Sequence, residues 1–167
     1  PFKGVLFAGL MIDDEGNPKL IEYNIRFGDP ECQALMLRME GDLLELLDKA
    51  ADQKLDEMTH SIGWSLEPSI CVVMAAKGYP GAYQKSSAIK NLHQVKDATV
   101  FHAGTKQSPQ GDILANGGRG LNNCARGKTL EVSRKKAYNA LSQIDWTDGF
   151  YRRDIGWRAL EISKKVS

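Results

Sequence analysis

The alternation of apolar and polar positions predicts a β-hairpin at the start of the chain. Residues 4–12 form a mostly apolar run, which is typical of a buried strand. Residues 13–17, with the sequence DDEGN, form a cluster of turn-favouring residues. Residues 19–27 then alternate with a period of two, as expected for a strand with two unlike faces.

The second strand of this hairpin has one apolar and one polar face. We expect the apolar face to pack in a core, because large apolar side chains are stabilised by burial. The polar face is the unusual one, since it carries three different kinds of polar group. The apolar face consists of Ile21, Tyr23 and Ile25, and the polar face of Glu22, Asn24 and Arg26.

Two helices are predicted after the hairpin. Asp29 fits the N-cap of the first, with Pro30 at its first helical position. Asp42 fits the N-cap of the second, and Glu45 lies three residues later, which is the spacing of a capping box. The apolar stripe of the second helix is expected to include Leu43, Leu46, Leu47 and Ala50.

The second half of the chain predicts several short strands and one long helix. The glycine-rich residues 117–120 indicate a turn or bulge, and the tail after residue 149 is interpreted as irregular or as an edge strand. The fold class is therefore α+β, in two unequal domains at 1–66 and 67–167. The strands are expected at 69–76, 99–105, 112–116 and 121–126, and the amphipathic helix within 128–144.

Composition narrows the class of protein. The hydrophobic fraction is 42% and the charged fraction 26%, both typical of a globular chain. The net charge of +1 gives no general attraction for nucleic acid or an anionic membrane, so we expect neither as a partner and any anion site must be local. No apolar run approaches the length of a membrane span.

The three cysteines are too few and too widely spaced for a zinc pattern, and none forms a C-x-x-C pair. This usage suits a reducing compartment, so the expected location is cytoplasmic. Cys71 lies in an apolar run and is expected to be a small buried residue. The chain opens in a strand pattern without a Met, which indicates a portion of a larger protein.

The polar face of the second strand suits a nucleotide–metal complex. Positions two apart on a strand project to the same side at intervals of about 7 Å. Glu22 and Asn24 offer the hard oxygen ligands that Mg²⁺ takes, and Arg26 offers a fork that matches phosphate or carboxylate oxygens. The alternative is a solvated surface with a Glu–Arg pair that contributes less than about 1 kcal/mol. Asp29 also has a plain interpretation as a helix cap.

The motifs of the chain, taken together, are similar to those of one enzyme family. The stretch GVLFAGLMI followed by IEYNIRFGDPECQ resembles the final ATP-grasp segment of the glycinamide ribonucleotide synthetases, also called phosphoribosylamine–glycine ligases. The stretches AAKGYPGAY, FHAGT, NGGRG, KAY and FYRRDIGWRAL resemble the C-terminal domain of the same family, in the same order. The resemblance runs from about Gly4 to Leu160.

The resemblance implies a fold and a reaction. The fold would be the last hairpin and helices of an ATP-grasp domain, followed by a β-rich C-terminal domain resembling a single-hybrid barrel or sandwich with a helix. The reaction joins glycine to 5-phosphoribosylamine in purine biosynthesis. ATP phosphorylates the glycine carboxylate, and the amine attacks the acyl phosphate to release phosphate and ADP. The expected cofactors are ATP and Mg²⁺ or Mn²⁺, and the upstream ATP-grasp and N-terminal domains are expected to be needed for activity.

By position, Glu22 and Asn24 match the metal ligands of the family. Arg26 is expected to face the transferring phosphate or the glycine carboxylate, and Asp29 to contact substrate ammonium groups. The family pattern also raises two differences. Many ATP-grasp enzymes carry a further acidic ligand on the preceding strand, where FAGLMI has none, and Gly120 replaces a β-branched residue, which is expected to loosen the strand.

Other interpretations stay open at this point. Lys77 and Arg119 either serve a substrate phosphate or are solvated charges on glycine-rich turns, and His102 is more typical of a structural than a catalytic histidine. The chain could belong to another ATP-grasp ligase, such as a biotin-carboxylase-like or purine-pathway carboxylating enzyme. It could also be a non-catalytic β-rich interaction module whose polar strand face is exposed to solvent and has no binding role.

Overall fold

The computed structural model describes residues 2–58 and 62–166, and their contacts divide the chain into two compact units. Unit 1 is formed by Pro1–Cys32 and Met39–Ser65, and unit 2 by Gln33–Arg38 and Leu66–Ser167. The helix α1 (Glu31–Met36) therefore contributes its first two residues to unit 1 and the rest to unit 2. Each unit is a mixture of helices and strands, as the α+β prediction requires.

Unit 1 begins with the predicted hairpin, in which β1 (Phe7–Ile12) pairs antiparallel with β2 (Pro18–Asn24). The turn is held by Asp13, whose Oδ1 accepts hydrogen bonds from the N–H groups of Glu15 (3.1 Å) and Asn17 (2.8 Å). A short Asp side chain can satisfy neighbouring N–H groups in this way, which is why such residues favour turns. The backbone bond to Asn17 is the largest influence that lowers the pKa of Asp13.

The predicted burial of the apolar face is wrong for the described residues. Ile21, Tyr23 and Ile25 are 63%, 61% and 75% exposed. The alternation that defines the face is present, but these side chains are largely exposed instead of packed in a core. β1 is also exposed over Leu10 to Ile12 rather than buried.

The two predicted helices of unit 1 form, with different starts. α1 begins at Glu31, after a turn in which the Cys32 N–H donates to the Gly28 carbonyl at 2.9 Å, so Pro30 precedes the helix instead of opening it. α2 (Leu43–Asp52) begins as predicted, because the Asp42 side chain accepts from the Glu45 N–H at 3.0 Å. Its apolar stripe is only partly buried. The remaining elements of unit 1 are β3 (Met39–Glu40), the 3-10 turn η1 (Leu55–Glu57) and β4 (Gly63–Trp64).

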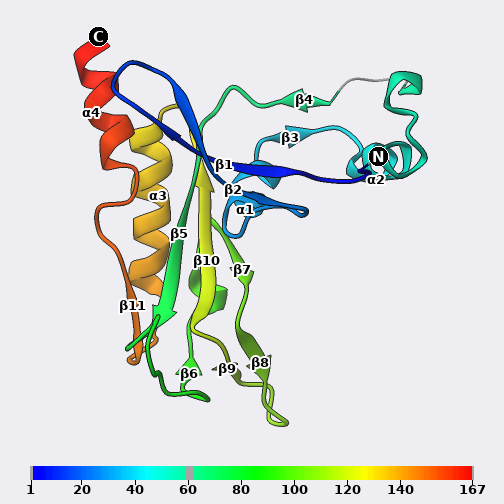
Figure 1. The fold of residues 1–167 in the computed structure, drawn as a ribbon. Coiled ribbons are helices and arrows are strands. Elements are labelled where there is room, and N and C mark those ends of the chain that lie inside the picture. The colour runs from blue at the N-terminus through cyan, green and yellow to red at the C-terminus, as the bar shows by residue number, and fades with distance from the viewer. Residues whose placement is uncertain (1, 59–61, 167) are drawn as a thin grey trace. The chain divides into compact units, whose positions relative to one another are not determined.

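Unit 2 is built on an antiparallel sheet with the order β11-β5-β10-β7, and α3 lies against β5 and β10 on one face (Figure 1). A second, smaller sheet has the order β6-β9-β8. The strands are β5 (Ser69–Ala76), β6 (Ala88–Ile89), β7 (Thr99–His102), β8 (Thr105–Gln107), β9 (Ile113–Ala115), β10 (Arg119–Arg126) and β11 (Gly149–Tyr151). The helical elements are η2 (Leu92–Gln94), α3 (Leu130–Gln143) and α4 (Trp157–Val166).

The core of unit 2 lies between α3 and the sheet. The Thr129 side chain caps α3 by accepting from the Val132 N–H at 3.2 Å, and the helix then runs without Gly or Pro. The Ser133 hydroxyl is fully buried, and it donates to the Pro68 carbonyl at 2.7 Å. The core side chains are Ile70, Val72, Met74, Ala76, Ile89, Ala115, Leu121, Ala125, Ala137, Leu141, Ile144 and Trp146.

The glycine-rich stretch forms the predicted bulge, since the register of β10 against β5 shifts between Arg119 and Leu121. A Cβ on Gly120 would lie 2.7 Å from the Trp146 ring, so the absent side chain leaves room for an indole. Trp146 is 4% exposed and donates its ring N–H to the Ser87 hydroxyl at 2.9 Å. Gly120 is thus closely packed at the bulge, and the expected loosening of the strand stays a prediction.

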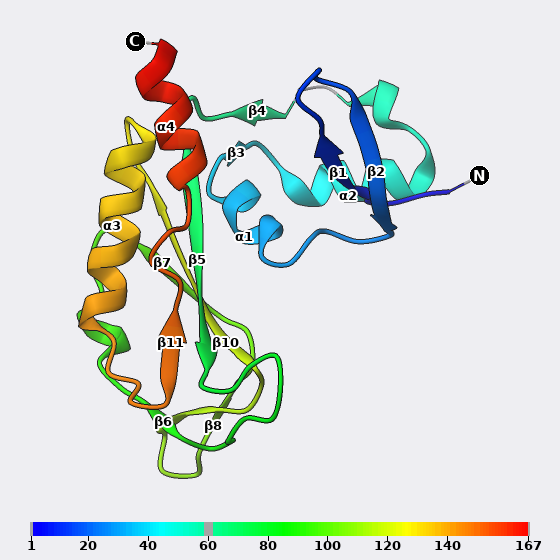
Figure 2. The ribbon, with the colours of Figure 1, turned by 60° about the vertical axis from the view of Figure 1, so that its left-hand side comes forward.

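The C-terminal tail is more regular than predicted. Gly149–Tyr151 is the edge strand β11 of the large sheet, as expected, but the helix α4 that follows was not predicted (Figure 2). The connection is held by Arg134, which donates to the carbonyls of Ile155 (2.9 Å) and Arg153 (2.6 Å). The Tyr138 hydroxyl adds a bond to the Arg152 carbonyl at 2.7 Å. These bonds from α3 hold the tail.

One polar side chain in the core of unit 2 generates a prediction. Asn123 on β10 is fully buried between Val72 and Val100, and its amide N and O have no hydrogen-bond partner among the described residues. We expect Asn123→Leu, which has a similar size, to raise the free energy of unfolding by about 1 kcal/mol, because it removes an unpaired buried amide. Asn123→Asp should lower it by several kcal/mol, because it buries a charge. Urea unfolding measures both, and a less stable Leu variant would contradict the assignment.

Candidate functional site

β2 brings two of the predicted site residues together. The Asn24 side chain donates from Nδ2 to Oε1 of Glu22 at 3.0 Å, so the two side chains lie on the same side of the strand. In the register of the hairpin, Glu22 is opposite Gly9 and Asn24 is opposite Phe7. This pair is the part of the polar face that the structure shows as one unit.

Gly9 is a residue of this site that sequence reasoning missed. A Cβ on Gly9 would lie 3.2 Å from Cγ of Glu22, which is tighter than ordinary packing. The Glu22 side chain therefore lies over Gly9, and the absence of a side chain there allows that position. The signal was present, because a glycine inside a strand often marks a close approach.

The donor atoms of the pair suit a hard divalent cation. Among the described residues, the Asn24 amide oxygen and the second Glu22 carboxylate oxygen accept no hydrogen bond. Two adjacent oxygen donors of this type match part of the shell of Mg²⁺ or Mn²⁺. In residues 2–58 and 62–166, no group of three His, Cys, Asp or Glu side chains is placed to hold a metal. The rest of such a shell would have to come from phosphate oxygens and water.

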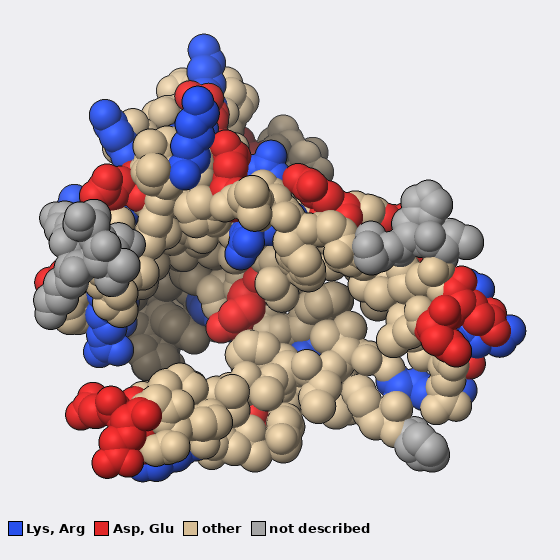
Figure 3. Space-filling view, turned by 90° about the horizontal axis from the view of Figure 1, so that it is seen from above, with Lys and Arg blue, Asp and Glu red and all other residues tan. Residues whose placement is uncertain are grey.

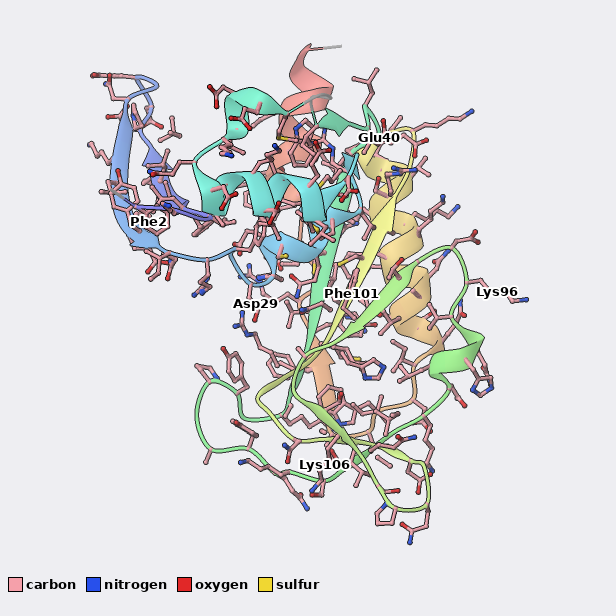
Figure 4. The ribbon with its side chains drawn as sticks, turned by 90° about the vertical axis from the view of Figure 1, so that its right-hand side faces the viewer. Phe2, Asp29, Glu40, Lys96, Phe101 and Lys106 are labelled. Carbon is pink, nitrogen blue, oxygen red and sulfur yellow. The ribbon has the colours of Figure 1, made fainter. Side chains whose placement is uncertain are left out.

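Arg26 and Asp29 are not part of this pair. β2 ends at Asn24, and the Arg26 guanidinium donates from Nη1 to the Phe27 carbonyl at 2.9 Å, so the predicted row of three is interrupted. Asp29 lies in the loop between β2 and α1 (Figure 4). Asp29 is two residues before the start of α1, and burial, with a smaller effect from the Asp29 carboxylate, raises the pKa of the Cys32 thiol in the first turn of that helix.

Three of the glycine-rich motifs meet in unit 2. The Gly104 carbonyl of FHAGT accepts from the N–H groups of Asn116 (2.7 Å) and Gly117 (2.9 Å), and the Gly104 N–H donates to the Arg119 carbonyl at 2.8 Å. A Cβ on Gly118 would lie within van der Waals overlap of the Tyr79 ring of the KGYPG turn. The motifs therefore have a shared structural basis in close backbone packing.

The charged residues of these motifs have different surroundings. Lys77 is exposed, and Arg119 is half-buried with a partner of its own. His102 is exposed, with Nδ1 2.9 Å from the Thr105 hydroxyl across the tight connection between β7 and β8. This contact agrees with a structural role for His102.

The surface charge and the helices of the structure indicate no further binding site on the face shown or in the described residues. On the face seen in Figure 3, Lys and Arg side chains are interspersed with Asp and Glu. Such mixing gives no extended field of one sign on that face. In the part of the chain that the structure describes, no helix has both the length and the apolarity to span a bilayer.

Comparison with known proteins identifies the family. Residues 69–158, more than half of the chain, match the family model described as phosphoribosylglycinamide synthetase, C domain. The chain belongs to the phosphoribosylglycinamide synthetase family. Residues 1–32, which contain the Glu22–Asn24 pair, match the model of the ATP-grasp (A) domain of the same family. The recognition made from the motifs is thus confirmed.

Curated relatives agree with this family. The chain is 53% identical over 167 residues to a phosphoribosylamine–glycine ligase of Brucella melitensis, covering 98% of the chain and 38% of the relative. It is 50% identical to that of Escherichia coli K12, covering 96% and 37%. It is 52% identical to the chloroplastic one of Arabidopsis thaliana, covering 95% and 30%. The chain spans between a third and two-fifths of the bacterial relatives and less of the plant one.

A solved structure supports the fold of this family member. The crystal structure of phosphoribosylamine–glycine ligase from Thermotoga maritima matches with a TM-score of 0.68 and 32% identity. The match covers 89% of this chain and 36% of the solved one. The mixed helix–strand fold is therefore that of a phosphoribosylamine–glycine ligase segment.

The close packing of the motifs predicts a stability effect. A Cβ on Gly104 would lie 2.6 Å from both the Arg119 carbonyl oxygen and the Gly117 Cα. Because these are backbone atoms, Gly104→Ala should lower the free energy of unfolding by about 2 kcal/mol through overpacking. The neighbouring variant Ala103→Ser, at an exposed position, is the control and should unfold like the wild type. Equal stability of the two variants in thermal unfolding would contradict the packing argument.

Proposed function

We propose that the complete protein ligates glycine to 5-phosphoribosylamine at the expense of ATP, giving glycinamide ribonucleotide, ADP and phosphate. The observation that carries this proposal is the paired Glu22 and Asn24 in a segment that matches the ATP-grasp domain of the family. The reaction passes through glycyl phosphate, whose acyl group the amine of phosphoribosylamine attacks. The relatives reported above are named for this ligase, which favours it over the carboxylating ATP-grasp enzymes and over a non-catalytic module.

Glu22 and Asn24 are the proposed metal ligands, for Mg²⁺ or Mn²⁺. Bound there, the cation would neutralise charge on the ATP phosphates. The hydrogen bond between the two side chains fixes their mutual orientation before any ligand binds. Gly9 leaves the carboxylate room to lie along the strand.

Arg26 and Asp29 are proposed to act on the substrates. The guanidinium of Arg26 stabilises negative charge on the transferring phosphoryl group or holds the glycine carboxylate. In the structure it bonds to the Phe27 carbonyl, so contact with substrate requires that bond to be exchanged. Asp29, in the loop after β2, is proposed to accept hydrogen bonds from a substrate ammonium group.

The proposed domain arrangement has residues 1–66 as the last part of an ATP-grasp domain and 67–167 as the β-rich C-terminal domain. The family matches to residues 1–32 and 69–158 support this division. The exposed apolar face of Ile21, Tyr23 and Ile25 supports a need for the upstream ATP-grasp residues, which we propose to cover it. We further propose a cytoplasmic enzyme with small-molecule substrates, in keeping with three unpaired thiols.

The role of Glu22 is tested in the full-length enzyme. Glu22→Ala should lower kcat/KM by at least about 100-fold, because a carboxylate that binds metal at the transferring phosphoryl group is lost. Glu22→Gln should lower it less and raise the concentration of Mg²⁺ needed for half-maximal rate. The assay is glycine-dependent release of ADP at varied Mg²⁺.

The control for this test lies on the same hairpin. Glu15 is an exposed carboxylate in the turn between β1 and β2. Glu15→Ala should keep kcat/KM near the wild-type value. Full turnover of Glu22→Ala at saturating Mg²⁺ would remove Glu22 from the metal site.

Gly9 provides an independent test of the same geometry. Gly9→Ala should lower kcat/KM by about 10-fold, because the added methyl displaces the Glu22 carboxylate by a few tenths of an ångström. Ala8→Ser, on the opposite face of β1, is the matched control and should be active. If both variants were equally active with unchanged metal dependence, the close approach of Gly9 and Glu22 would have no role in the site.

A further inference from the structure

Two of the cysteines that are distant in sequence are neighbours in the sheet of unit 2. Cys71 on β5 lies directly opposite Cys124 on β10 in the antiparallel register. Both are free thiols in the structure. The expectation that Cys71 is a buried apolar residue is wrong, since it is half-buried and has another thiol as its neighbour.

The backbone hydrogen bonds show which type of cross-strand pair this is. The Ala103 N–H donates to the Gly120 carbonyl, so Gly120 and every second residue after it on β10 direct their backbone groups toward β7. Cys124 belongs to that series. The Lys77 N–H donates to the Asp148 carbonyl. The odd-numbered residues of β5, including Cys71, therefore direct their backbone N–H and C=O groups toward β11.

Neither cysteine therefore shares backbone hydrogen bonds with the other. In such a non-hydrogen-bonded pair the Cα atoms are about 4.5 Å apart and the side chains are at their closest. A disulfide accepts Cα separations of about 4.4–6.8 Å. The two sulfurs can be joined without moving the strands apart.

The two thiols differ in access to solvent. Cys124 is fully buried and Cys71 is half-buried. A hydrogen bond with Cys71, followed by burial, raises the pKa of the Cys124 thiol, so Cys71 is the one that meets a reagent first.

We propose that Cys71 and Cys124 form a redox-active cross-strand dithiol, which a low-molecular-weight disulfide converts to a disulfide bond. The Cys71 thiolate attacks one sulfur of the small disulfide and expels the other as a thiolate. Cys124 then gives up its proton to that thiolate and attacks the Cys71 sulfur, which releases the second small thiol. The net change oxidises two protein thiols and reduces one small disulfide to two thiols.

The test uses the purified protein equilibrated with reduced and oxidised glutathione at a series of ratios. Samples are acid-quenched, denatured and alkylated, and intact mass then counts the reactive thiols. We expect the alkylated cysteines to fall from three to one as the oxidised form increases, and peptide mapping to link Cys71 to Cys124. A reducing dithiol should restore all three.

Single variants separate the steps. Cys32→Ser is the matched control and should still form the disulfide, leaving no alkylatable thiol. Cys124→Ser should stop at a mixed disulfide between glutathione and Cys71, and Cys71→Ala should leave Cys124 unmodified. The proposal is overturned if the wild type keeps three alkylatable thiols at every ratio, if the link involves Cys32, or if the link forms only in denaturant.

Discussion

The antiparallel pairing of β5 with β10 is the constraint on which the rest of unit 2 depends. β10 is flanked by β5 and β7 and is buried along almost its whole length, so its register decides which residues reach the core and which face away from α3. Met74 and Leu121 meet as neighbours on the side of α3 because of this register, and Cys71 and Cys124 meet on the other. A slip by one residue would exchange the two sets. The bulge at Gly120, where the register shifts, is packed against Trp146.

Unit 1 follows a different principle. Its hairpin is held by turn chemistry and strand pairing, while both faces of β2 are largely exposed. Side chains are thus positioned there mostly by local bonds, and the bond between Asn24 and Glu22 is the clearest case. Such an arrangement leaves polar oxygens accessible to a charged ligand. It also means that small residues near the pair, such as Gly9, influence the position of Glu22 through the space that they leave for its side chain.

The sequence predicted local features well and non-local ones poorly. The apolar run of β5 and the capping residue Asp42 depend on neighbours in the chain, so their patterns are readable. The period of two placed Glu22 and Asn24 on one side, but could not show that the strand ends before Arg26. The helix α4 was missed because nothing like the Asp42 or Thr129 cap announces its start at Trp157. The pairing of Cys71 with Cys124 depends on a register between distant strands, which no local pattern specifies.

The enclosed position of Trp146 makes one indole of the chain an intrinsic optical probe. Trp146 is 4% exposed, whereas Trp64 and Trp157 are 46% and 43% exposed. Emission from an indole shielded from water lies at shorter wavelength and resists ionic quenchers, so Trp146 should contribute the bluest and least quenched part of the emission. Fluorescence can therefore follow the opening of unit 2 without any introduced label.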